Sequence, residues 1–135
     1  MFGKKKTVSF SNATTLIAFG TTITGDIQFN GTLEIEGMVV GNIVAEEASN
    51  ATVRVLERGQ VKGEIKVASA IINGKVDGNV HSSSYLELAS QALIEGNVDY
   101  NVIEMAKGAQ VNGNLLYTPQ QAEVKAIEHL GKQES

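Results

Sequence analysis

The chain has 135 residues, 42% of them hydrophobic, with a net charge of −4 and no cysteine. This length and apolar content fit one domain with a core, and the lack of cysteine excludes disulfides and thiolate chemistry. Few aromatic residues and the acidic balance argue against a nucleic-acid-binding surface, and no apolar run is long enough to span a membrane.

Residues 1–14 are read as a flexible tail with a basic tip. The tip combines two apolar and three cationic side chains: Met1, Phe2, Lys4, Lys5 and Lys6. Near an anionic leaflet each lysine is worth about 1 kcal/mol, so the tip is a candidate membrane-targeting element. A solvated tail without that role is the alternative. No apolar stretch of a secretory signal follows, and we therefore expect a cytoplasmic protein.

A five-residue pattern recurs along the middle of the chain: aliphatic, any residue, glycine, polar, aliphatic. Its six glycines are Gly25, Gly41, Gly63, Gly78, Gly96 and Gly113. The intervals between them are 16, 22, 15, 18 and 17 residues. The residues between the glycines alternate with period 2, which is typical of strands. Each unit is expected to contain a strand, a turn of small residues and a second strand that runs through the glycine motif.

This repeat predicts an all-β fold, a parallel β-solenoid of about six rungs over residues 15–117. A period near 17 residues leaves no room for a crossover helix, so each period forms one turn that pairs in register with the next. Glycine suits a position that lies between two inward aliphatic residues or at a corner with positive φ. The longest glycine interval predicts an outward loop from Glu46 to Thr52.

The two ends of such a solenoid expose unpaired strands and one apolar layer each. The candidate layer at the N-terminal end contains Leu16, Ile17, Ile23, Ile27 and Phe29. The candidate layer at the C-terminal end contains Ile103, Met105, Val111, Leu115, Leu116 and Tyr117. The short polar segment before Thr15 shows no helical pattern, and Pro119 ends strand pairing. Uncapped ends predict that identical copies stack into a homopolymer.

The segment after Pro119 leaves an alternative open. Residues 118–135 are read as a flexible tail, but Gln120 to Leu130 could form a short helix that covers the C-terminal end. A covered end would give an adaptor that does not polymerise.

Catalytic interpretations are weaker. His81 could serve as the base of a β-helix acyltransferase, but no carboxylate is evident to orient it. Glu34 and Glu36 could pair as in a sugar-cleaving solenoid, but they are expected on a solvated outer face. The glycines match no phosphate-binding motif. We therefore expect no catalytic residues, no cofactor, no bound metal and no nucleotide.

One stretch resembles a known family. TLIAFGTTITGDIQF, from Thr15 to Phe29, opens the match, and residues 31–37 and 41–43 continue it. These segments resemble the start of the bactofilin domain, a bacterial cytoskeletal family, and the resemblance covers about residues 15–117. The chain departs from the family at Ala18, where glycine is usual, and in its long second glycine interval.

The resemblance implies a single right-handed β-helix with short disordered tails. It further implies nucleotide-independent filaments in which like ends meet, and a membrane-targeting N-terminal peptide that the basic tip matches. Filaments of this kind associate with the inner face of the cytoplasmic membrane and scaffold cell-shape, cell-wall or polarity proteins.

Overall fold

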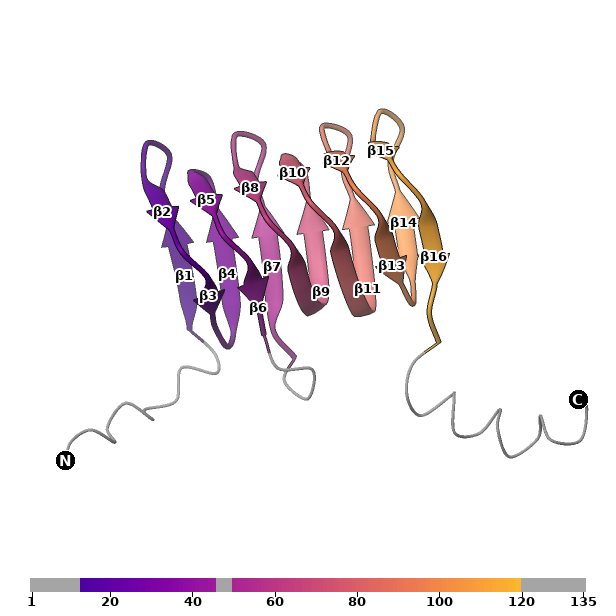
Figure 1. Ribbon diagram of the computed structural model, residues 1–135, viewed down its shortest axis with the longest axis horizontal. Coiled ribbons are helices and arrows are strands. Elements are labelled where there is room, and N and C mark those ends of the chain that lie inside the picture. Colours follow the sequence, from indigo (N-terminus) through magenta and orange to yellow (C-terminus); the bar gives the residue numbers. More distant parts are fainter. Residues whose placement is uncertain (1–12, 46–49, 120–135) are drawn as a thin grey trace, which may run out of the picture.

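The computed structural model describes residues 13–45 and 50–119, and the regular structure of this part is entirely β-strand. Sixteen strands form a parallel β-solenoid of six turns, as the repeat predicts (Figure 1). In Figure 1 the chain rises along the rear, crosses the top and descends in front while it advances toward the C-terminus. The coil is therefore right-handed, as the resemblance implies.

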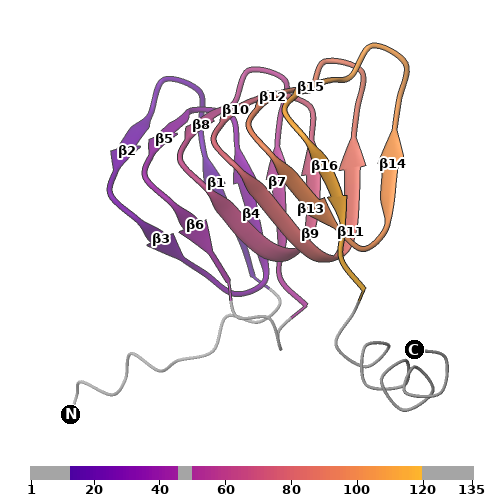
Figure 2. The same cartoon turned by 45° about the vertical axis from the view of Figure 1, so that its right-hand side comes forward.

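Each turn has three sides, as the turned view shows (Figure 2). The first face contains β1 Thr14–Ile17, β4 Thr32–Ile35, β7 Thr52–Val55, the second halves of β9 Ile65–Ile72 and β11 Val80–Leu88, and β14 Ile103–Met105. The second face contains β2 Thr22–Thr24, β5 Met38–Val40, β8 Gln60–Lys62, β10 Lys75–Asp77, β12 Leu93–Glu95 and β15 Gln110–Asn112. The third face contains β3 Ile27–Gln28, β6 Ile43–Val44, the first halves of β9 and β11, β13 Val98–Tyr100 and β16 Leu115–Tyr117.

Three sides replace the two-strand unit expected from the sequence, because the repeat glycine lies at a corner. In the third turn, Gly63 separates β8 from β9, so Val61 and Ile65 point inward from different faces. Both side chains are 0% exposed. The period-2 pattern continues through the corner, and the sequence alone therefore reads as one strand where the structure has two.

The repeat glycines also make room for backbone. Gly63 has a φ of +155°, which disfavours other residues. A Cβ on Gly63 would collide with the carbonyl oxygen of Gly41 in the turn before, and a Cβ on Gly78 would collide with that of Gly63. We expected these glycines to leave space between inward side chains and to allow a corner with positive φ. The corner is confirmed, whereas the close neighbour is the main chain of the preceding turn and not an inward side chain.

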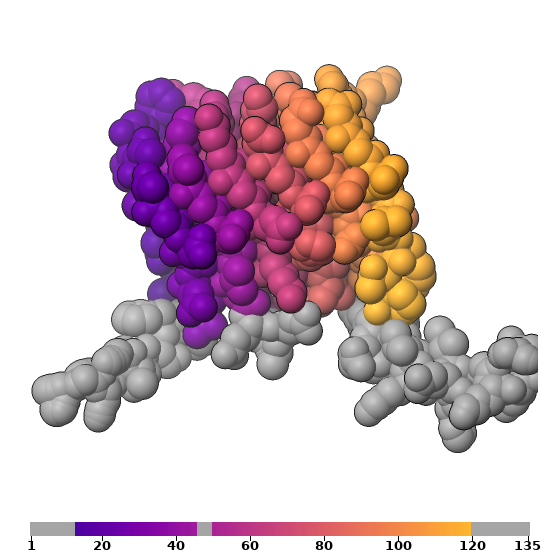
Figure 3. All heavy atoms as spheres, in the orientation of Figure 1, coloured from indigo at the N-terminus to yellow at the C-terminus, as the bar shows by residue number. Residues whose placement is uncertain are grey.

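The interior is a stack of aliphatic layers, one in each turn, and the turns pack as slanted bands (Figure 3). In the third turn the layer consists of Val53, Val55, Val61, Ile65 and Val67, none more than 2% exposed. Full burial of such side chains stabilises the fold by roughly 1.5–3 kcal/mol each. No turn could bury its own layer alone, so the stack is cooperative along its axis.

The three corners of each turn form three edges along the molecule. The upper edge joins the first and second faces and contains residues 18–21, 36–37, 56–59, 73–74, 89–92 and 106–109. The glycine edge joins the second and third faces and follows the repeat glycines. The terminal edge joins the third and first faces and contains residues 13–14, 30–32, 50–52, 68–69, 83–84, 101–102 and 118–119.

Corners of unequal length explain why the glycine intervals vary. On the upper edge, corners of four residues stand in the first, third, fifth and sixth turns, and corners of two residues in the second and fourth. The predicted outward loop begins in a part of the chain that is not described, residues 46–49. Its last residue, Thr52, already belongs to β7.

Candidate assembly surfaces at the two ends

The N-terminal end presents three strands that pair on one side only. β1, β2 and β3 pair with the second turn and have no neighbour before them among the described residues. Four apolar side chains of this turn point inward: Ile17, Ile23, Ile27 and Phe29. Ile17 is 7% exposed, while the other three are only partly buried and pack against the core.

The C-terminal end presents a more open layer. β14, β15 and β16 pair with the fifth turn and, within the described chain, with nothing beyond it. Ile103 and Val111 are partly buried, whereas Met105, Leu115 and Tyr117 are 45%, 44% and 60% exposed. This end therefore carries the larger uncovered apolar area.

The comparison between turns shows what would cover these side chains. Leu88 occupies the same position as Met105 one turn earlier and is 0% exposed. Val98 stands in the same relation to Leu115 and is also 0% exposed. A further turn is what buries each position, so a β-edge of matching width and apolar pattern would complete both ends.

Two predicted end residues have a different orientation. Leu16 lies beside Glu34 and Leu116 beside Asp99 in the strand register, and these columns point outward. Leu16 is 53% exposed and Leu116 is 49% exposed. They stand on the sides of the terminal turns and not in the apolar layers, because neighbouring residues of a strand point to opposite faces.

Comparison with known proteins identifies this fold. A family model described as "Bactofilin: Polymer-forming cytoskeletal" matches residues 15–116. The chain belongs to the bactofilin family. It is also 31% identical over 103 residues to Bactofilin BacO of Myxococcus xanthus (strain DK1622). The matched region covers 76% of this bactofilin and 79% of that protein. No solved structure matches the chain significantly.

Membership decides between the classes of function that the sequence left open. A bactofilin is a polymer-forming cytoskeletal protein, so this chain self-associates and is not an acyltransferase or a glycosidase. The candidate pair of carboxylates fits that conclusion. Glu34 lies 3.7 Å from Arg54 and Glu36 lies 3.6 Å from Arg58. Glu36 stands on the upper edge beyond the end of β4, so the two carboxylates do not share one strand as expected.

The expectation that no carboxylate lies beside His81 was wrong. Its Nδ1 is 2.7 Å from Oδ2 of Asp99, and its Nε2 is 3.9 Å from Oε1 of Glu64. Asp99 is 18 residues away in sequence but directly adjacent in the β11–β13 register. Both ring nitrogens are directed at carboxylates, so the histidine links the third, fourth and fifth turns on the outside of the third face.

A second feature missed from the sequence is a ladder of polar side chains along the glycine edge. Oδ1 of Asn42 accepts the backbone N–H of Glu64 at 2.9 Å, and Oδ1 of Asn79 accepts that of Asn97 at the same distance. Oδ1 of Asn97 in turn accepts the N–H of Asn114 at 3.0 Å. The polar residue after each repeat glycine was the signal, since amide side chains satisfy backbone groups where the strands break.

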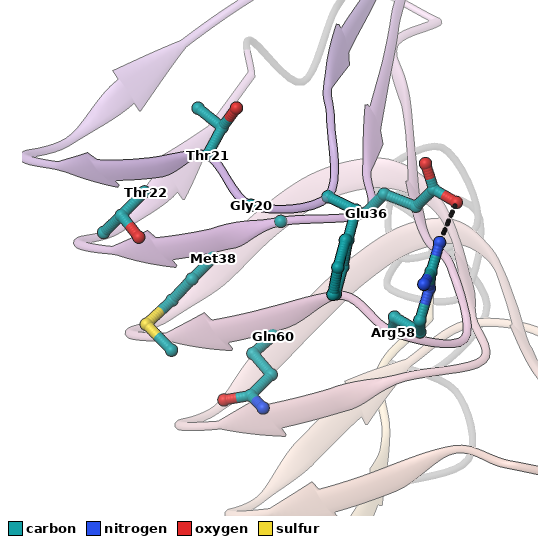
Figure 4. A pocket seen from close by; sticks show the side chains of 9 residues that line it. Gly20, Thr21, Thr22, Glu36, Met38, Arg58 and Gln60 are labelled. Carbon is teal, nitrogen blue, oxygen red and sulfur yellow. Dashed lines mark ion pairs between the residues drawn. The ribbon is translucent and has the colours of Figure 1, made fainter.

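A groove of about 210 Å³ lies on the upper edge (Figure 4). It forms above Gly37, where a short corner lies between two long ones. The Arg58 guanidinium stands 3.9 Å from the centre of the Phe19 ring and pairs with Glu36. These contacts connect the third turn to the first and help to hold the terminal turn in place.

Tyr85 occupies the outer side of the first face, near the terminal edge. Its hydroxyl lies 3.1 Å from a carboxylate oxygen of Glu87 and 3.1 Å from one of Glu104. Burial first, and then these hydrogen bonds and negative charges, raise the pKa of Tyr85 to about 12.

The basic tip and the segment from Gln120 to Leu130 lie outside the described residues, so both remain predictions. Within residues 13–45 and 50–119, no helix is long and apolar enough to cross a membrane.

Proposed function

We propose that this bactofilin polymerises end to end through its two terminal layers. The observation that carries the proposal is the contrast between turns: positions that are 0% exposed inside the stack are close to half exposed in the sixth turn. Stacking a second copy would pair the free strand edges and bury both layers. The inward residues of the first and sixth turns form the proposed contacts, and Leu16 and Leu116 stand beside them.

We further infer that the filament associates with the inner face of the cytoplasmic membrane through Met1, Phe2 and the three lysines at positions 4–6. One tip supplies a weak attraction, but a filament carries one tip for each copy. Many linked weak contacts raise binding by orders of magnitude. On the membrane the filament would scaffold cell-shape or cell-wall proteins, which the exposed faces of the solenoid could bind.

Two measurements test these proposals separately. Negative-stain electron microscopy of the purified full chain without nucleotide should show filaments, and a monomer at high concentration would contradict end-to-end assembly. Co-sedimentation with vesicles that contain phosphatidylglycerol should show binding of the full chain. Deletion of residues 2–6 should abolish that binding and leave the filaments intact. Equal binding by the deleted chain would refute the role of the tip.

A further inference from the structure

We propose that the filament lies on the lipid surface along its terminal edge, the edge between the third and first faces. This inference rests on the proposed membrane association and specifies which part of the solenoid meets the bilayer. The second face, opposite this edge, would then point into the cytoplasm and be open to protein partners.

The first argument is where the chain leaves the solenoid. Ala13 lies on the terminal edge, where its carbonyl oxygen accepts the N–H of Thr32 at 3.1 Å. Residues 7–12 separate the basic tip from this point, and an extended chain spans at most about 3.6 Å per residue, or roughly 25 Å. A tether this short keeps a membrane-bound tip close to the edge where it begins. In every copy of a filament the chain leaves the solenoid at this same edge. The membrane-bound tips of all copies therefore favour one orientation of the filament, with the terminal edge toward the membrane.

The C-terminal side of the solenoid ends on the same edge. Thr118 donates its N–H to the carbonyl oxygen of Tyr100 at 2.7 Å and accepts a hydrogen bond from Nδ2 of Asn101 at 3.2 Å. The exits at the first and sixth turns therefore lie along one line, which Figure 1 shows at the bottom of the molecule.

The second argument is charge. The described residues include ten acidic and six basic side chains, a net charge of −4. None of these sixteen lies on the described part of the terminal edge, which instead carries hydroxyl and amide groups such as those of Thr32, Ser69 and Asn101. An anionic leaflet repels acidic side chains over about 10 Å at ordinary salt. Among the described residues, the terminal edge is thus the part of this acidic solenoid that meets the headgroups with the least repulsion, while Glu46 and Glu47 belong to the adjoining segment that is not described.

The other two edges fit a lipid surface less well. The upper edge carries Glu36, Glu57, Arg58 and Lys107, and the glycine edge carries acidic side chains at Asp26 and Glu64. The glycine edge would bring unbalanced carboxylates against anionic headgroups, whereas on the upper edge two cations balance the two carboxylates. Neither is the edge from which the chain leaves, and this decides against the upper edge.

Fluorescence quenching can locate the edge, since the chain has no cysteine of its own. Single variants Ser69→Cys on the terminal edge and Gln60→Cys on the second face carry an environment-sensitive dye. Both positions lie in central turns and are partly buried. Polymers of the full chain are bound to phosphatidylglycerol vesicles that contain a lipid-attached quencher. Ser69→Cys should be quenched at least about twice as strongly as Gln60→Cys.

Each outcome has a distinct meaning. Equal or reversed quenching on bound filaments would overturn the assignment of the edge and leave membrane association standing. If the labelled chains do not sediment with the vesicles at all, the proposed membrane association fails and the edge assignment fails with it.

A charge variant gives an independent test. Thr32→Glu places one acid per copy on the terminal edge and should weaken vesicle binding of each copy about fivefold. The matched change Ser90→Glu lies on the exposed upper edge and should leave binding within twofold. Both variants should pellet as polymers without vesicles. Equal loss of vesicle binding in the two variants would contradict the proposed orientation.

Discussion

Leu115 and Leu116 form a matched pair that tests the end contact. They are adjacent in β16 and similarly exposed, at 44% and 49%, but Leu115 points into the terminal layer and Leu116 points to the side. Leu115→Lys should therefore prevent polymerisation, whereas Leu116→Lys should leave it nearly unchanged.

The magnitude follows from burial. Covering the exposed 44% of Leu115 is worth about 1 kcal/mol, as a share of the gain for a fully buried leucine. Burying an unpaired ammonium in its place costs several kcal/mol more. The end contact would weaken by about 4 kcal/mol or more, which corresponds to roughly a thousandfold in association. In the Leu116→Lys variant the association constant of the end contact should change by less than about threefold.

Sedimentation measures the effect as the protein concentration above which polymer pellets, and circular dichroism confirms that each variant is folded. If Leu115→Lys is folded and pellets at the wild-type concentration, the terminal layer is not the contact. If Leu116→Lys disrupts polymer as strongly, the contact involves the side of the turn.

The size of the product that Leu115→Lys leaves is also informative. Where like ends meet, the intact N-terminal contact keeps two copies together, and sedimentation equilibrium gives a dimer. Where unlike ends meet, every contact in the filament contains a changed residue, and the product is a monomer. The same variant therefore reports whether the filament has a direction.

Three further predictions concern the folded chain. Gly78→Ala should lower the free energy of unfolding by at least about 3 kcal/mol, because the new Cβ would meet the carbonyl oxygen of Gly63. Gly25 has a φ of +127° but no atom within 4 Å of an added Cβ, so Gly25→Ala should cost less. Equal losses of stability in thermal unfolding would contradict this account. Tyr85→Phe should remove the contribution of Tyr85 to the loss of stability between pH 10 and 12, since the raised pKa favours the neutral phenol of the folded chain. An unchanged pH profile of stability in denaturant titrations would argue against the assignment. Arg58→Ala should speed amide exchange in β1 and change global stability by less than about 1 kcal/mol, and unaltered exchange would show that the contact is without effect.

The sequence was a good guide to the solenoid because its signals are local. The glycine motif recurs at intervals of 15 to 22 residues, and the aliphatic residues two positions before and two positions after each repeat glycine point inward. The outward orientation of Leu16 was also available, since it precedes the inward Ile17 in a strand of period 2.

The features that the sequence did not predict depend on how turns of different length align. His81 meets Asp99 only because the intervening corners bring them into register, and no local pattern records that pairing. The three-sided cross-section was missed for a related reason: alternation continues through the glycine corner, so periodicity does not reveal the bend. The lack of charged side chains on the described part of the terminal edge is visible only after the corners have been assigned.

The direction of the hydrogen bonds has a mechanical consequence. Strand pairing joins turn to turn, so these bonds run along the long axis of the solenoid (Figure 1). A pulling force along a filament passes in series through each contact between successive turns. Within one such contact, the paired strands of the three faces carry the force together. Inside one copy the covalent chain also connects each turn to the next. Between two copies no peptide bond makes that connection. Under tension such a filament should part at its joints and release intact subunits that can rejoin.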